Sequence, residues 1–316
     1  MLGEVIKLDR KYPLVRCEDG LELRCEEAAT VKKRSSLRCA IGDIVEVSSP
    51  SDHEFGIIEK IHPRRTAFER KDPADRTTSQ VLAANFGQVV IIEPFDRINL
   101  KRIERELVLA HETGAEVAIL LSKYDTKTPD ERTQIIKEVS DIAGRLVDVH
   151  EVSIKEPCSI LKLKNDLFAG KTSILLGQSG AGKSSLINML IGEDVQVTGN
   201  VRASDGKGRH TTVDRSMIDL PMENSETCRI VDMPGIRGLG LWNAQTGIEH
   251  AFMEIEDLSQ NCKFRDCSHT NEPGCAVKQA VEDGDLSAAR LSSYLELKKE
   301  IADTLDRRER TSWKNK

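Results

Sequence analysis

The sequence is poor in long apolar runs and in aromatic residues, and it contains no internal repeat. No apolar run approaches the roughly 20 residues that a membrane-spanning helix requires, which argues against a membrane protein. Aromatic residues make up 4% of the chain, so few rings are available to stack on nucleic-acid bases. With 39% hydrophobic and 31% charged residues, the composition is typical of a globular protein.

An excess of positive charge is also lacking. The 46 Lys and Arg residues are outnumbered by 52 Asp and Glu residues, which gives a formal net charge of −6. This balance does not favour nucleic-acid binding through overall electrostatic attraction. RNA contact would need local patches, such as Lys32-Lys33-Arg34 or the tail with Arg307, Arg308 and Arg310. Ordinary solvent-exposed charge is the simpler interpretation of both patches.

The N-terminal segment and the cysteines favour a reducing compartment. Residues 1–7 lack the basic and apolar segments of a secretory signal peptide. Of the eight cysteines, three lie close to a histidine near the C-terminus, which is typical of metal binding rather than of a disulfide framework. We therefore expect a cytoplasmic protein. The remaining cysteines are interpreted as small buried or incidental residues: Cys17, Cys25, Cys39, Cys158 and Cys228.

Length and local patterns predict three domains. Residues 1–68 contain five short β segments, with Asp19-Gly20 typical of a tight turn, and an OB-fold barrel fits them best. Residues 69–242 alternate strands with helices, which predicts a doubly wound α/β domain. Continuous apolar runs predict buried strands at 88–93 and 116–121, and a further strand is predicted over 145–152. Thr128-Pro129-Asp130-Glu131 predicts the start of a helix, with Thr128 as its cap. Residues 243–316 are predicted to be helical apart from a Cys/His-rich loop.

A glycine-rich loop in the middle of the chain follows the apolar run Ser173-Ile174-Leu175-Leu176. It reads Gly177-Gln178-Ser179-Gly180-Ala181-Gly182-Lys183-Ser184, with Ser185 next, in the strand–loop–helix context of a phosphate-binding P-loop. Backbone N–H groups and a helix N-terminus cradle polyphosphate in such a loop. Lys183 would reach the β- and γ-phosphates, and the Ser184 hydroxyl would bind Mg²⁺. A chance glycine loop is the weaker alternative.

A base-recognition motif is predicted before the P-loop. Leu121-Ser122-Lys123-Tyr124-Asp125 follows a buried strand, at the place where GTPases carry Asn-Lys-x-Asp. The Asp125 carboxylate would accept hydrogen bonds from guanine N1–H and N2–H₂, which adenine does not offer, and the Lys123 stem would cover the ring. Ser122 replaces the usual Asn and shortens a side chain that braces the loop. Ser153 and Lys155, after the next strand, would support the base.

Two switch segments are predicted after the P-loop. Asp232-Met233-Pro234-Gly235 ends a strand, so Asp232 would hold Mg²⁺ through water and the Gly235 N–H would meet the γ-phosphate. The earlier segment, residues 206–212, is rich in glycine and polar residues. Within it Thr212, or Thr211 as the less favoured choice, would complete the Mg²⁺ shell.

The residue after Gly235 bears on hydrolysis. A Ras-type enzyme places a water-orienting Gln there, whereas this chain has Ile236, which cannot hydrogen-bond water. His210 is the candidate to position the attacking water, because imidazole can donate or accept a hydrogen bond near neutral pH. An exposed loop histidine without a catalytic role is the alternative. For Arg209 two roles stay open: stabilising the charge of the transferred phosphate, or contacting RNA.

The order of the motifs is base, base, phosphate, switch, switch. A Ras-like chain runs phosphate, switch, switch, base, base, and the same fold results when the chain is cut between strands and its termini are rejoined. The order therefore predicts a circular permutation. The second switch would then lead directly into the C-terminal domain.

A set of metal-binding residues lies near the C-terminus. Cys262, Cys267, His269 and Cys275 have the spacing C-x4-C-x-H-x5-C. Three thiolates and one imidazole form a complete tetrahedral set for structural Zn²⁺ and leave no open position for catalysis. A buried or redox-active cysteine cluster is the alternative.

Over nearly its whole length the chain resembles the RsgA/YjeQ family of circularly permuted GTPases. The resemblance is carried by residues 80–85 (QVLAAN), the P-loop, residues 208–212, residues 232–235, and residues 262–275 with their Glu272-Pro273-Gly274. It implies an N-terminal OB-fold, a central permuted GTPase domain and a C-terminal zinc domain. It also implies late assembly of the small (30S) ribosomal subunit, contact with its rRNA, and subunit-stimulated GTP hydrolysis that drives release. A catalytic role for His210 is implied as well.

Other functions stay open at this point. One is a GTP-dependent RNA-binding switch or RNA-modification partner outside ribosome assembly. Another is an ATPase with the same P-loop, against which Asp125 argues. With either GTP-dependent function we expect GTP and GDP as ligands, no membrane association and a monomer.

Overall fold

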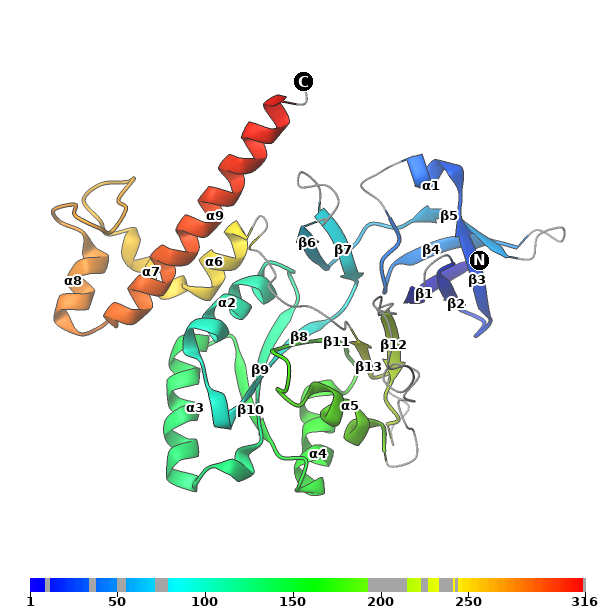
Figure 1. The fold of residues 1–316 in the computed structure, drawn as a ribbon, viewed down its shortest axis with the longest axis horizontal. Helices are drawn as coiled ribbons and strands as arrows, with labels where there is room; N and C mark the ends of the chain where they lie inside the picture. The colour runs from blue at the N-terminus through cyan, green and yellow to red at the C-terminus, as the bar shows by residue number, and fades with distance from the viewer. Residues whose placement is uncertain are drawn as a thin grey trace, which may run out of the picture.

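A computed structural model gives the fold of most of the chain. The described residues are 1–8, 12–33, 38–49, 55–71, 79–192, 215–222, 227–232, 241 and 244–314. They form an N-terminal barrel, a central sheet with helices on both faces, and a helical C-terminal part that lies beside the central sheet (Figure 1). This is the predicted fold class.

In the described part of the chain, five strands close the N-terminal barrel. They are β1 (Leu2–Leu8), β2 (Leu14–Cys17), β3 (Glu22–Glu27), β4 (Ile44–Ser48) and β5 (Gly56–Ile61), with the short helix α1 (Ala29–Lys33) after β3. The barrel closes in the order β1-β2-β3-β5-β4 because β4 also pairs with β1. Alternate strand residues such as Val5, Val15 and Val45 fill its interior. The predicted five-stranded barrel is confirmed.

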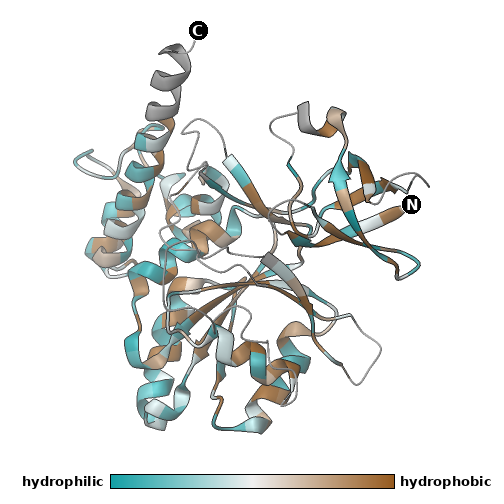
Figure 2. Cartoon of the chain, turned by 45° about the vertical axis from the view of Figure 1, so that its right-hand side comes forward, coloured by the Kyte–Doolittle hydropathy of each residue, from teal (hydrophilic) through white to brown (hydrophobic). Residues whose placement is uncertain are grey.

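The central sheet has the strand order β10-β9-β8-β11-β13-β12. Its strands are β8 (Gln88–Pro94), β9 (Glu116–Ser122), β10 (Asp148–Val152), β11 (Thr172–Leu176), β12 (Arg215–Asp219) and β13 (Arg229–Asp232). All neighbouring pairs are parallel except β12–β13. Figure 2 shows apolar residues concentrated in these strands. The strand before the glycine loop, β11, follows β9 and β10 in the chain, as the predicted permutation requires.

Helices cover both faces of this sheet, as a doubly wound domain requires. They are α2 (Leu100–His111), α3 (Pro129–Ala143), α4 (Pro157–Leu163) and α5 (Lys183–Ile191). Along β8, Val89 and Ile91 pack in the core that holds α2 and α3, whereas Val90 and Ile92 pack in the core of α4 and α5. Every residue of β8 is buried, which explains its unbroken apolar run.

The C-terminal part packs on α2. Its helices are α6 (Gln245–Ala251), α7 (Met253–Ser259), α8 (Ala276–Asp283) and α9 (Ala288–Lys314). The Arg290 side chain on α9 donates to Glu104 on α2 at 2.9 Å, and both side chains are nearly buried. Among the described residues, none of the helices combines the length and apolarity needed to cross a bilayer.

Three features differ from the sequence predictions or were missed by them. The hairpin β6 (Ala67–Lys71) and β7 (Ser79–Ala84) was not predicted, and the predicted boundary after residue 68 falls inside β6. β12 pairs with β1, which joins the barrel to the central sheet. The strand predicted over 145–152 begins at Asp148, because α3 ends at Ala143, Gly144 caps it with φ 76°, and a turn follows.

Asn85 connects the barrel to the hairpin. Its side chain donates to Gly42 O at 2.9 Å and accepts from Arg65 N at 2.9 Å. A Cβ on Gly42 would lie 2.0 Å from Ala84 O, so only glycine permits this approach. Part of the 80–85 motif therefore has a structural role at the junction of two domains.

Candidate nucleotide and metal sites

The glycine-rich loop holds the ammonium group of Lys183 through hydrogen bonds to its backbone oxygens. Gly177 has φ +135°, and a Cβ there would lie 2.3 Å from Ile92 O, so the loop can pack on β8 only with glycine. Gly182 is left-handed (φ 96°) and directly precedes α5. Lys183 Nζ donates to Gln178 O at 2.8 Å and to Gly177 O. The strand, loop and helix expected for a phosphate-binding loop are present.

A cavity of about 180 Å³ lies between this loop and the ends of β9 and β10. Because β9 and β10 are parallel neighbours, with Ser122 opposite Val152, both base motifs reach the same edge of the sheet. The lining combines residues from the base motifs and the P-loop: Ser122, Lys123, Ile154, Gly180, Gly182 and Ser185. The structure thus brings together motifs that lie about 60 residues apart in sequence.

Asp125 is held by the second base motif. Ser153 Oγ and Lys155 Nζ each lie 2.6 Å from its carboxylate. The Lys155 ammonium, and then the Ser153 hydroxyl, lower the pKa of Asp125, which therefore stays ionised at neutral pH. An ionised carboxylate accepts hydrogen bonds only, which suits recognition of the guanine N1–H and N2–H₂ donors.

Ser122 braces the P-loop despite its short side chain. It is buried, and its Oγ donates to Ala181 O at 2.7 Å. The bond connects the end of β9 to the middle of the phosphate loop. The serine therefore retains a connection between the base motif and the P-loop.

Removing this hydroxyl by Ser122→Ala is expected to weaken nucleotide binding about threefold to tenfold, the usual value of one buried hydrogen bond. Titration with a fluorescent guanine nucleotide measures the effect. Ser140→Ala, an exposed serine on α3, is the matched control. An unchanged Kd in Ser122→Ala would show that the brace does not contribute to binding.

Glu106 is a buried carboxyl group on α2 near the P-loop. Its Oε2 has no hydrogen-bond partner among the residues that the structure describes. Burial, and then the Glu93 carboxylate, raise the pKa of Glu106 to about 7. The charges of Arg102, and then of Lys183, lower this pKa and act in the opposite direction.

This raised pKa predicts a pH-dependent stability. The folded state holds the Glu106 proton more tightly than the unfolded state does. The stability that this bound proton contributes is therefore complete below the ordinary glutamate pKa of 4.5 and is lost as pH rises from there through about 7. Glu106→Gln should therefore raise the unfolding free energy at pH 8 by about 1 to 3 kcal/mol and change it little at pH 5. Urea denaturation at both pH values tests this, with the exposed Glu138→Gln on α3 as control. Equal effects of Glu106→Gln at pH 5 and pH 8 would contradict the assignment.

Several residues that were predicted to contact the γ-phosphate, Mg²⁺ or the attacking water lie outside the described residues. They are His210, Thr211, Thr212 and Gly235. Asp232 is described as the last residue of β13, which runs parallel to β11, so its backbone lies at the same edge of the sheet as the P-loop. The roles of these five residues stay predictions.

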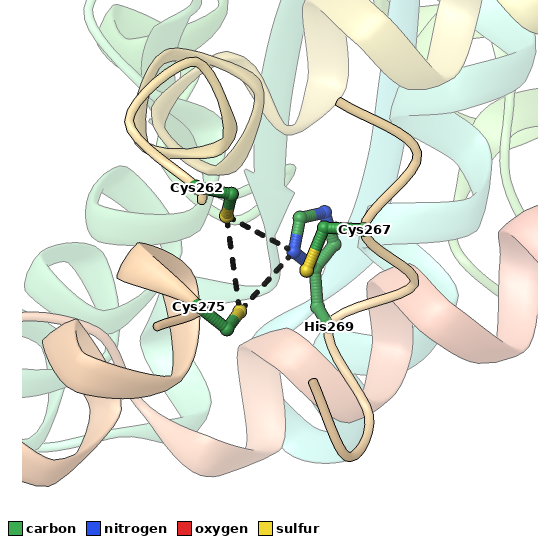
Figure 3. A group of neighbouring side chains, drawn as sticks. All are labelled: Cys262, Cys267, His269 and Cys275. Atoms are coloured by element: carbon green, nitrogen blue, oxygen red, sulfur yellow. Dashed lines mark hydrogen bonds between the residues drawn. The ribbon is translucent and has the colours of Figure 1, made fainter. Parts of the chain in front are cut away.

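The four predicted metal ligands converge from one loop and the start of α8 (Figure 3). Their ligand atoms all lie within 4.8 Å of one another. The Sγ atoms of Cys262 and Cys275 are 3.8 Å apart, and His269 Nδ1 lies 3.4 Å from the Cys275 Sγ. Ligands about 2.0–2.3 Å from a tetrahedral ion stand about 3.3–3.8 Å apart, so this donor set fits zinc. The cluster can hold a metal ion.

Glu272 shapes the loop that carries these ligands. Its carboxylate accepts from Ser268 N at 2.8 Å, from Ser268 Oγ at 2.5 Å and from Thr270 N at 3.0 Å. These bonds, the Ser268 hydroxyl first, lower the pKa of Glu272 to about 2. Gly274 has φ +74°, and its carbonyl accepts from Lys263 N at 3.0 Å. The Glu-Pro-Gly segment therefore holds the ligand loop in shape.

Two arginines that contact the P-loop were missed by sequence reasoning. Arg97 Nη2 donates to Gly180 O at 3.3 Å, and Arg102 Nη1 donates to Gln178 Oε1 at 3.1 Å. Both lie at or just before the start of α2, where charged residues look like an ordinary solvated face. No local pattern could have distinguished them.

The fold and the two sites define a circularly permuted P-loop GTPase that also carries a Cys/His cluster able to hold a metal ion. The family model described as RsgA GTPase matches residues 61–242. The small ribosomal subunit biogenesis GTPase RsgA of Streptomyces avermitilis is 40% identical over 305 residues, covering 95% of this chain and 79% of the relative. The chain belongs to the RsgA GTPase family and is a GTP-hydrolysing enzyme.

Solved structures agree with this assignment. The crystal structure of YjeQ from Thermotoga maritima superposes with a TM-score of 0.70 and 25% identity, covering 95% of this chain and 98% of that one. The crystal structure of YloQ, a circularly permuted GTPase, has a TM-score of 0.65 at 24% identity, with 96% and 95% coverage, and supports the fold alone. The permutation predicted from the motif order is confirmed.

Proposed function

We propose that this GTPase acts in the cytoplasm, as a monomer, in late maturation of the small (30S) ribosomal subunit. The observation that carries the proposal is the 40% identity, over 95% of the chain, to a relative named for small ribosomal subunit biogenesis. The GTP-bound form binds the subunit and its rRNA, and subunit-stimulated hydrolysis to GDP and phosphate drives release. The barrel (residues 1–68) and the C-terminal domain (residues 243–316) provide the contacts, and residues 69–242 hold the nucleotide.

In this proposal the P-loop backbone, residues 177–185, binds the phosphates, and Lys183 contacts the β- and γ-phosphates. Its present bonds to two loop carbonyls support this, because they hold the ammonium within the loop. Ser184, Thr212 (less favourably Thr211) and Asp232 would hold Mg²⁺, which neutralises phosphate charge when it is bound. The Gly235 N–H meets the γ-phosphate.

Zinc is the metal that we propose for the cluster of Cys262, Cys267, His269 and Cys275. Three thiolates and an imidazole suit zinc better than magnesium or calcium, which prefer oxygen ligands. Since the set is complete with four protein ligands, its role is structural.

Guanine selectivity is assigned to Asp125, with Lys123, Ser153 and Lys155 supporting it. Asp125→Ala is expected to lower the preference for GTP over ATP at least about 100-fold, because two hydrogen bonds to a charged acceptor are lost. Competition of ATP and GTP against a fluorescent guanine nucleotide measures this. Asp141→Ala, exposed on α3, is the control. Equal displacement by ATP and GTP in the unaltered protein would revive the ATPase alternative.

The proposed function is tested with purified small subunits. GTPase activity should rise when they are added, and the protein should sediment with them in the presence of a non-hydrolysable GTP analogue but not of GDP. If neither stimulation nor co-sedimentation is observed, the proposal is wrong. GTP-dependent binding to isolated RNA alone would instead favour a switch outside ribosome assembly.

A further inference from the structure

An ion pair of a buried carboxylate and a partly buried guanidinium lies beside the P-loop. Glu93, at the carboxyl end of β8, is completely buried, and Arg102 on α2 forms two hydrogen bonds to it. The first, from Arg102 Nε to Glu93 Oε2, is 3.2 Å long. The remaining Nη1 of the guanidinium donates to Gln178 Oε1 at 3.1 Å. A single side chain thus bridges a buried carboxylate and the P-loop.

The position of Arg102 is closely determined by its surroundings. Asn99 accepts from Arg102 N at 3.1 Å as the N-cap of α2, and Asn99 N in turn donates to Glu93 Oε1 at 3.2 Å. Burial raises the pKa of Glu93, whereas the hydrogen bonds from Arg102 oppose that rise. Because a guanidinium is planar and presents a fixed fork of donors, this arrangement leaves it little freedom.

Gln178 connects the ion pair to the P-loop lysine. While its side chain accepts from Arg102, its backbone oxygen accepts from Lys183 Nζ at 2.8 Å and from Ala181 N at 3.2 Å. Arg97 Nη2 adds a bond to Gly180 O at 3.3 Å. The loop is therefore held at two points, by Arg102 on α2 and by Arg97 in the turn that precedes α2.

We propose that Arg102, held by Glu93, is a positioning residue that pre-forms the P-loop for nucleotide through Gln178. The inference rests on the proposed phosphate-binding role of the P-loop. A loop that is already ordered loses less conformational freedom when it binds phosphate, so the pair strengthens affinity. Arg102 acts through Gln178 rather than on the phosphates, so it affects nucleotide binding much more than the hydrolysis step.

The test is a double-mutant cycle on nucleotide affinity. Arg102→Lys keeps a cation beside Glu93, which protects the fold, but it loses the guanidinium donors that reach Glu93 and Gln178 together. Gln178→Ala removes the side-chain oxygen that accepts from Arg102. Each variant is expected to raise the Kd for GDP and GTP about threefold to tenfold. For Arg102→Lys, kcat at saturating GTP is expected to stay within about twofold of wild type. The Kd of the double variant should be no higher than the higher of the two single-variant values, because both changes break the same Arg102–Gln178 connection. Additive losses would overturn the proposal.

Two further variants separate the possible failures. Arg105→Lys alters a neighbouring arginine of α2 that pairs with Glu300 on α9, and its Kd should match wild type. Lys183→Ala should lose nucleotide binding. If Lys183→Ala binds normally, the P-loop assignment itself is wrong. If it loses binding while Arg102→Lys matches wild type, or if Arg102→Lys lowers only the melting temperature of the nucleotide-free protein, the positioning role of Arg102 is wrong.

Discussion

Replacing His210 by alanine is expected to leave GTP affinity within about twofold of wild type and to lower subunit-stimulated hydrolysis about 100-fold or more. The physical reason is that Ile236, after the predicted Gly235 contact, cannot orient the attacking water, so another group is needed, and the His210 imidazole is the candidate. Phosphate release at saturating GTP, with and without purified small subunits, measures the effect. Fluorescent-nucleotide titration of the same variant measures affinity.

The matched control for this prediction is His250→Ala, an exposed histidine on α6 outside the nucleotide site. It should hydrolyse GTP at the wild-type rate. Stimulated turnover that survives unchanged in His210→Ala would eliminate the catalytic role of His210. A loss of GTP affinity equal to the loss of turnover would instead make it a binding residue.

The second large effect is expected from disrupting the metal cluster. Cys262→Ser or removal of the metal by a strong chelator should lower the unfolding free energy of the C-terminal part by about 3 kcal/mol or more, because structural zinc supplies folding energy directly. The physical reason is the position of the ligands. Cys275 is the N-cap of α8, and the His269 ring lies beside Tyr294 of α9, so the loss reaches both helices.

Metal content by mass spectrometry, together with thermal denaturation, checks this prediction. Cys158→Ser, an exposed cysteine outside the cluster, should retain one zinc per chain and the wild-type melting temperature. Since the P-loop is built from other elements, GDP affinity should be retained in Cys262→Ser. A wild-type melting temperature after complete metal removal would contradict a structural role.

Local signals in the sequence predicted most of the elements near the site. The Thr128 cap, Pro129 and Glu131 mark the start of α3, and the structure shows both hydrogen bonds of the capping box between Thr128 and Glu131. The unbroken apolar run of β8 predicted a strand that is buried on both faces. These predictions succeeded because the deciding interactions lie within a few residues of one another.

Contacts between distant segments were not predicted. The antiparallel pairing of β12 with β1, supported by the ion pair of Arg229 with Glu4 at 2.5 Å, joins segments more than 200 residues apart. The bond from Ser122 Oγ to Ala181 O similarly spans 59 residues. Neither leaves a periodic pattern or a motif in the sequence.

By itself, the sequence determined which chemical groups this protein carries: a glycine loop with Lys183, a carboxylate at Asp125, and a Cys/His set that can hold a metal ion. The tertiary structure decided which residues support that chemistry. Glu93 lies on β8 and Arg102 on α2, and only the folded structure places this pair in contact with Gln178 of the P-loop. The physical reason is that backbone freedom and side-chain type are local properties of a chain. The burial of Glu93 and the contact of Arg102 with Gln178, 76 residues away, exist only after distant strands and helices have packed together.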